Sequence, residues 1–167
     1  MRGEIDYEYR TGIGTDLHRF GPDRPLVLGG IEVPYALGLA GHSDGDVALH
    51  AVIDALLGAA AMGDIGTLFP DTDESLKDAD SRGFTITVKE LLAEKKWEVV
   101  NIDLTVHAEQ PRLEKFKGQM KRAIAGLMEI DFNNVNVKAK TNEGIGEIGA
   151  ANAIAATAAV LLRRRVK

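Results

Sequence analysis

Within Glu98–His107, apolar and polar side chains alternate strictly from Val100 onward. One face of an extended chain would carry Val100, Ile102, Leu104 and Val106, and the other would carry Asn101, Asp103, Thr105 and His107. A period of two predicts a strand with one buried face, so the chain must fold around a sheet that packs against a core.

Helical patterns flank this strand. Residues 45–62 predict a helix, as do Leu113, Phe116, Met120, Ile124 and Leu127 by their spacing. Residues 81–96 carry two patterns, because 85–88 favour a strand and 91–96 favour a helix, and of the two we expect the helix. Further strands are expected at 12–18, 26–33 and 135–139, the first two separated by a turn at Gly21-Pro22, and a closing helix at 150–165. Strands interleaved with helices predict an α/β or α+β sandwich-like fold, a mixed β-sheet packed against helices.

Composition narrows the function. The 167 residues, without repeats or linker-like stretches, predict one domain over 1–167. A net charge of -5 argues against duplex nucleic acid or an anionic membrane as the main partner. The absence of cysteine excludes disulfides, thiolate metal sites and cysteine nucleophiles. The longest uncharged run, residues 148–162, is too short to span a membrane, and no signal or transit segment is evident, so a cytoplasmic location is expected.

A carboxylate and two imidazoles form the first candidate site. Asp16 and His18 are two apart and share one face of a strand, and His50 lies one turn into a predicted helix with Asp54 on its face. These three N/O ligands suit a catalytic zinc-type ion with an open fourth position, and Asp54 could orient a ligand. The alternative is that Asp16 caps a turn and the histidines are ordinary polar residues.

Residues 41–46 precede a predicted helix, where free N–H groups and the helix dipole favour an anion. Ser43 and Asp46 resemble a capping box there. Residues 64–66 and 69–73 are acidic loops that could accept hydrogen bonds from sugar hydroxyls, or could be solvated turns. A further candidate group lies near the end of the chain and comprises Lys138, Lys140, Thr141 and Glu143. These side chains could hold a polyphosphate and its Mg²⁺, or could be ordinary polar residues at the end of a surface strand.

Taken in order, six segments resemble the 2-C-methyl-D-erythritol 2,4-cyclodiphosphate synthase family. They are G-I-G-T-D-L-H at 12–18, H-S-D-G-D-V-A-L-H-A at 42–51, D-A-L-L-G-A-A at 54–60, G-D-I-G at 63–66, L-F-P-D-T-D at 68–73 and N-V-K-A-K-T at 136–141. The resemblance implies a homotrimer with active sites between subunits. It implies an enzyme, a phosphorus–oxygen lyase, that cyclises 4-diphosphocytidyl-2-C-methyl-D-erythritol 2-phosphate and releases CMP in non-mevalonate isoprenoid biosynthesis.

The resemblance also assigns residues. Asp16, His18 and His50 would bind a zinc-type ion, and Glu143 would bind Mg²⁺ or Mn²⁺ at the substrate diphosphate. His42 and Thr141 would stabilise the transition state. Substrate contacts would come from Asp16, His18, His42, Ser43, Asp64, Gly66, Phe69, Pro70, Asp71, Thr72, Asp73, Ala108, Pro111, Arg112, Ala139, Lys140, Thr141 and Glu143, with residues 108–114, Ala139 and Lys140 lining a cytidine pocket.

Two departures and two rival functions accompany this resemblance. Family members often carry G-F-T-G-R where residues 146–150 read G-E-I-G-A, so no phosphate-binding role is carried onto Glu147 or Ala150. Residues 1–11 lie outside the resemblance and receive no role. The rival functions are a metal-dependent phosphoesterase that activates water and a non-catalytic trimer that binds cytidine nucleotides.

Overall fold

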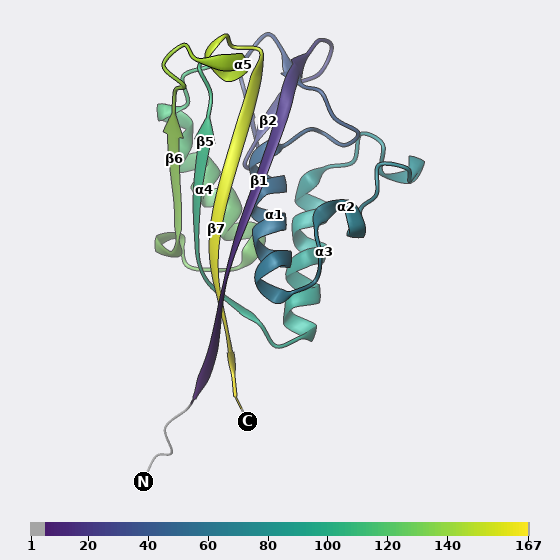
Figure 1. Ribbon diagram of the computed structural model, residues 1–167, viewed down its shortest axis with the longest axis vertical. Helices are drawn as coiled ribbons and strands as arrows, with labels where there is room; N and C mark the ends of the chain where they lie inside the picture. The colour runs from purple at the N-terminus through teal and green to yellow at the C-terminus, as the bar shows by residue number, and fades with distance from the viewer. Residues whose placement is uncertain (1–5, 167) are drawn as a thin grey trace.

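A mixed five-stranded sheet forms the centre of the molecule (Figure 1) in a computed structural model that describes residues 6–166. The strand order is β4-β1-β7-β5-β6. The bounds are β1 Tyr7–Gly21, β4 Gly38–Leu39, β7 Ala153–Arg165, β5 Glu98–His107 and β6 Val135–Lys140. The pair β5/β6 is parallel and the other pairs are antiparallel. The expected mixed sheet is therefore present.

Helices cover one face of this sheet. In Figure 1, α1 and α4 lie behind the strands, and α3 packs beside α1. The helices are α1 Val47–Ala60, α2 Ile65–Leu68, α3 Ser81–Glu94, α4 Lys117–Met128 and α5 Gly146–Gly149, and 3₁₀ turns span Glu74–Leu76, Glu114–Phe116 and Phe132–Asn134. On the opposite face of the sheet, Ile13 and Leu17 of β1 are 73% and 59% exposed. Among the described residues, no helix is both long enough and apolar enough to cross a membrane.

Two glycines bring α1 unusually close to β1. A β-carbon on Gly14 would lie 2.1 Å from the carbonyl oxygen of Ala51, and one on Gly12 would lie 2.0 Å from that of Ala55. Any larger side chain would push the helix away from the strand. This close packing brings the first turn of α1 within reach of the side chains that follow on the same face of β1.

The predicted closing helix at 150–165 is wrong, because Ala153–Arg165 forms the strand β7. Its buried positions alternate through Ile154, Ala156, Ala158, Val160 and Leu162. Alanine favours a helix by only about 0.5 kcal/mol per residue over ordinary residues. Backbone pairing with β1 on one side and β5 on the other outweighs that preference, and the small side chains leave room for α1.

The remaining predicted strands and helices agree with the structure to different degrees. The strand Glu98–His107 and the helix at 81–96 are confirmed, the latter ending at Glu94. The strand expected at 26–33 is instead two short antiparallel strands, β2 Leu26–Leu28 and β3 Ile31–Val33. The strand expected at 12–18 extends over Tyr7–Gly21, so residues 7–11 belong to the sheet, whereas residues 1–5 lie outside the described part.

The expected capping box at Ser43 is also wrong, because the N-cap of α1 is Asp46. Its buried carboxylate accepts hydrogen bonds from the N–H groups of Ala48 and Leu49 at 3.1 and 3.0 Å. It also accepts bonds from Gly29 and Gly30 at 2.8 and 2.7 Å. One carboxylate thus satisfies the first turn of α1 and the turn between β2 and β3.

Candidate metal centre and adjoining cavity

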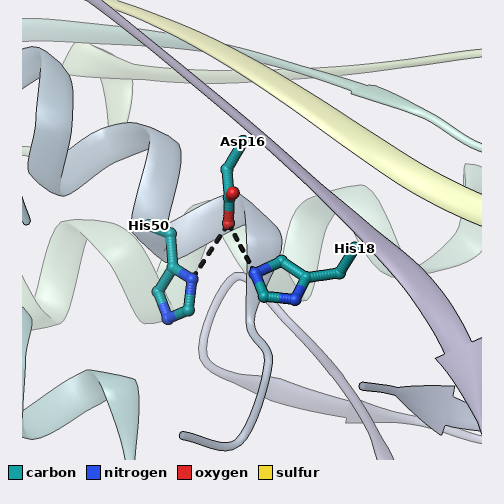
Figure 2. A group of neighbouring side chains, drawn as sticks. All are labelled: Asp16, His18 and His50. Carbon is teal, nitrogen blue, oxygen red and sulfur yellow. Dashed lines mark hydrogen bonds and ion pairs between the residues drawn. The ribbon is translucent and has the colours of Figure 1, made fainter. Parts of the chain in front are cut away.

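Asp16, His18 and His50 converge at the interface of β1 and α1 (Figure 2). Asp16 and His18 project from the strand face that packs on α1, and His50 comes from the first turn of α1. The Asp16 Oδ2 atom lies 2.9 Å from His18 Nε2 and 2.9 Å from His50 Nδ1. The three side chains can each offer one ligand atom, all within 4.8 Å of one another.

The electrostatics of the group follow from this proximity. Burial raises the pKa of Asp16, but hydrogen bonds with His18 and His50 outweigh it and hold that pKa well below its usual range. Burial lowers the pKa of His18, whereas the hydrogen bond and charge of Asp16 raise it, with a net increase. Asp16 is therefore an anion at neutral pH, as a metal-ligating carboxylate must be.

The donor set fits a divalent cation of the zinc type. His18 donates from Nδ1 to the carbonyl oxygen of Ala40 at 2.5 Å, so the lone pair of Nε2 points at the group. One carboxylate oxygen and two imidazole nitrogens form a three-ligand N/O set of the kind that catalytic zinc sites use. This supports the expected zinc-type site, while the identity of the ion remains a proposal.

A cavity of about 310 Å³ opens next to these ligands. Besides the metal-binding group, its walls include five residues expected to contact substrate: His42, Ser43, Gly66, Phe69 and Asp71. Phe69 stacks on Phe84 with ring centroids 4.3 Å apart, which fixes the apolar wall. The helix α2 and the loop after it therefore border the same space as the metal ligands.

The remaining acidic residues of these loops have structural partners. Asp64 caps α2 by accepting hydrogen bonds from the N–H and hydroxyl of Thr67, both at 2.8 Å. Asp73 caps the turn Glu74–Leu76, and His42 Nε2 lies 3.1 Å from its carbonyl oxygen. Pro70 and Thr72 lie exposed between them.

Asp54 does not orient a histidine as expected. Its carboxylate instead accepts a hydrogen bond from the N–H of Ile65 at 2.8 Å, which anchors the start of α2 beside α1.

A second group of expected site residues gathers where the parallel strands β5 and β6 end. The N–H of Ala108 donates to the carbonyl oxygen of Lys140 at 2.9 Å, and the N–H of Asn142 donates to the carboxylate of Glu109 at 3.1 Å. Thr141 donates from its hydroxyl to Glu143 at 2.8 Å. The group comprises Ala108, Pro111, Arg112, Ala139, Lys140, Thr141 and Glu143.

Within one chain these two groups lie apart. The strand order places β7 and β5 between β1 and β6, a separation of three strand spacings or about 14 Å. The register aligns Leu17, Ala155, His107 and Lys140 in one row across the sheet. Lys140 thus shares a face with Leu17, whereas Asp16 and His18 project from the opposite face.

Sequence reasoning missed two groups that shape the site. Arg24 donates to the carbonyl oxygens of Leu39, Gly41 and Ser43, and so holds the segment that carries His42. Ser81, fully buried at the start of α3, reaches His50. A hydroxyl at a predicted helix start was visible in the sequence, but its contact with a residue 31 positions earlier depends on tertiary packing.

Comparisons with known proteins agree on one family. Residues 9–163 match the YgbB family. The 2-C-methyl-D-erythritol 2,4-cyclodiphosphate synthase of Haemophilus influenzae is 49% identical over 156 residues, which cover 93% of this chain and 99% of that protein. That of Chlorobaculum parvum is 48% identical over 156 residues, with coverage of 93% and 99%.

Solved structures give the same result. A Plasmodium falciparum IspF in complex with CDP superposes with a TM-score of 0.82 at 32% identity, covering 95% of this chain and 97% of that one. The bifunctional IspDF of Campylobacter jejuni gives a TM-score of 0.92 at 42% identity. The match covers 95% of this chain and 43% of that bifunctional chain.

Proposed function

This chain belongs to the YgbB family, and from that premise we infer that it catalyses the formation of 2-C-methyl-D-erythritol 2,4-cyclodiphosphate, the reaction that names its relatives. One observation supports this inference most strongly. The carboxylate and two imidazoles of Asp16, His18 and His50 border a cavity whose other walls come from the segments that resemble the family.

The reaction is an intramolecular phosphoryl transfer. An oxygen of the 2-phosphate of 4-diphosphocytidyl-2-C-methyl-D-erythritol 2-phosphate attacks the β-phosphorus of the same molecule's diphosphate. The bond from that phosphorus to the bridging oxygen breaks, and CMP leaves with the electron pair. No protein nucleophile is required, so the task of the protein is to fold a flexible polyanion until the attacking and leaving oxygens are in line.

We propose that Asp16, His18 and His50 hold a zinc-type ion at the cavity. Such an ion supplies positive charge to the phosphate oxygens as negative charge develops. His42 and Ser43, which line the same cavity, would donate hydrogen bonds to the phosphate oxygens. The loop that carries Phe69 and Asp71 would enclose the methylerythritol, with Asp64, Gly66, Pro70, Thr72 and Asp73 in the same two segments.

The second group would bind the cytidine end of the substrate. Ala108, Pro111, Arg112, Ala139 and Lys140 would line the base and ribose pocket at the ends of β5 and β6. Thr141 would stabilise the transition state through its hydroxyl. Glu143, an exposed carboxylate, would provide an oxygen ligand to Mg²⁺ or Mn²⁺ on the diphosphate.

The two groups are separated in a single chain. Their strands β1 and β6 lie about 14 Å apart, and Lys140 projects from the face opposite to that of Asp16 and His18. We therefore propose a cyclic homotrimer in which one subunit supplies the zinc-type ion and its neighbour supplies the cytidine pocket. Ile13 and Leu17, exposed at 73% and 59% on the open face, are apolar residues that such an assembly would cover.

Product analysis tests the function directly. The purified protein, supplied with zinc and Mg²⁺, is incubated with the diphosphocytidyl substrate and followed by phosphorus NMR. The expected products are CMP and a cyclic diphosphate. Release of inorganic phosphate would instead identify a phosphoesterase, and binding of CDP without turnover would identify a nucleotide-binding module.

A further inference from the structure

The two ring nitrogens of His50 have different surroundings. Nδ1 faces Asp16 Oδ2 at 2.9 Å, on the side of the metal site. Nε2 faces away from it, toward the hydroxyl of Ser81 at 2.9 Å and that of Ser43 at 3.2 Å. Ser81 is the first residue of α3 and is fully buried, so solvent does not compete for this contact.

Asp44 determines the direction of the hydrogen bond between Ser81 and His50. One oxygen of its carboxylate accepts from the N–H of Ser81 at 3.0 Å, and the other lies 2.5 Å from the Ser81 hydroxyl. The second oxygen also accepts from the N–H of Asp46 at 3.1 Å. An ionised carboxylate can only accept hydrogen bonds. The Ser81 proton therefore points to Asp44, and the lone pairs of its oxygen are left for His50.

In the free ring the two sides compete, because the Asp16 carboxylate favours a proton on Nδ1 and the lone pairs of Ser81 favour one on Nε2. If Nδ1 ligates an ion, the single proton of a neutral His50 lies on Nε2. Ser81 is placed to accept that proton at 2.9 Å in a buried setting. Ser43 does not oppose this arrangement, because its rotatable hydroxyl can accept from Nε2 as well as donate to it.

We propose that Asp44 and Ser81 are positioning residues that orient His50 and accept its Nε2 proton, so that Nδ1 can ligate the ion. The proposal rests on the metal site of the proposed function. It adds a chain of two hydrogen bonds that couples the start of α3 and the loop before α1 to one proposed metal ligand. The Ala40 carbonyl holds His18 in the same sense, so both rings have a partner on the side away from the ion.

The affinity of the protein for zinc tests this proposal without an activity assay. Zinc affinity is measured by competition with a chromophoric chelator. Ser81→Ala should weaken binding by about 10- to 100-fold, the usual effect of removing a partner of a metal-ligating histidine. Thr85→Val is the matched control, because it removes another buried hydroxyl of α3, one that bonds the Ser81 carbonyl and does not contact His50. Its zinc affinity should equal that of the wild type.

The N–H proton of His50 provides a readout that general loss of stability would not change. Proton–nitrogen correlation spectra are recorded on the zinc-loaded protein. Wild type and Thr85→Val should show a His50 Nε2–H proton in slow exchange with solvent, because buried Ser81 accepts it. Ser81→Ala should shift this resonance and speed its exchange, since the acceptor is removed.

The outcomes separate this proposal from the metal assignment. If wild-type protein binds no zinc, the metal site itself is wrong. If the wild type binds zinc tightly and Ser81→Ala binds it equally well, the positioning role is overturned and the metal site stands. A spectrum of the zinc-loaded wild type with the His50 proton on Nδ1 would overturn the role as well, because zinc would then be bound through Nε2.

Discussion

His50 connects three parts of the site, since it contacts Asp16 through one nitrogen and Ser81 and Ser43 through the other. Replacing it removes one of three proposed ligands and leaves the carboxylate and His18 alone. Two protein ligands from one strand are fewer than the three that zinc-type sites use. We therefore expect the protein to lose most of its affinity for the ion.

We expect wild-type protein to carry about one zinc-type ion per chain as purified, and His50→Ala to lose most of it together with most activity. Elemental analysis of the two proteins measures this. His107→Ala is the matched control, because His107 is half-buried at the end of β5 and contacts Asn142. Unchanged metal content in His50→Ala would show that the ion binds elsewhere.

Glu143 poses a separate question, because it lies in the second group and its proposed ligand is Mg²⁺ or Mn²⁺. Glu143→Gln keeps the shape of the side chain and removes its charge. The variant should retain the zinc-type ion but need a severalfold higher Mg²⁺ concentration for turnover. Glu147→Gln serves as control, since that carboxylate accepts a hydrogen bond from Asn152 and has no proposed ligand role. Superimposable Mg²⁺ titrations of Glu143→Gln and wild type would remove Glu143 from the ligand set.

The three candidate metal ligands could be picked out from the sequence. Asp16 and His18 are two residues apart on a strand and so share one face, and His50 lies in the first turn of a predicted helix. The residues that orient them could not be predicted this way. Asp44, Ser81 and Arg24 act on residues 19 to 37 positions away through contacts that only the packed fold creates.

At the scale of elements, α1 is the piece on which the site is built, and Asp46 fixes its start. Four backbone N–H groups donate to this one buried carboxylate, from Gly29, Gly30, Ala48 and Leu49. Removing the carboxylate would leave all four donors without this partner, and those of Gly29, Ala48 and Leu49 are buried away from water, whereas Gly30 is half-buried.

We therefore expect Asp46→Ala to lower the free energy of unfolding by about 3 kcal/mol, more than the loss of an ordinary N-cap. Urea denaturation at one fixed protein concentration measures the change, since assembly would make stability concentration-dependent. Asp80→Ala, which removes the exposed N-cap of α3, should cost about 1 kcal/mol or less. Equal losses in the two variants would mean that the buried bonds to Gly29 and Gly30 contribute little.

The elements themselves were predictable where one pattern dominates. The alternation from Val100 to His107 was sufficient for β5. At 81–96 the β-branched residues 85–88 favoured a strand against the helix that the structure contains, so no single pattern dominated there. In β7 the local preference of alanine and the two-residue burial pattern point to different structures, and pairing on both sides decides in favour of the strand. The same small residues, with Gly12 and Gly14 opposite, let α1 approach the sheet.

At the scale of the whole molecule, the strand order separates the two groups of site residues, because β7 and β5 lie between β1 and β6. Asp16 and His18 face the helices, whereas Lys140 shares the open face with Leu17. A cyclic assembly joins different surfaces of neighbouring chains, so it can bring one chain's metal-binding face to the next chain's β5 and β6 ends. The proposed trimer therefore makes a quantitative prediction about mixed subunits.

His18→Ala disables the zinc-type site, and Glu143→Ala disables the second ion site, so each variant alone should be nearly inactive. Co-expressed in equal amounts, the two chains should mix at random. An interface is intact when one neighbour retains His18 and the other retains Glu143, each with a probability of about one half. Activity should then recover to about one quarter of wild type, far above either parent and above a mixture of separately purified parents. If mass spectrometry confirms mixed trimers and their activity does not exceed that of the parents, each site lies within one chain, and the separation across the sheet must be bridged in another way.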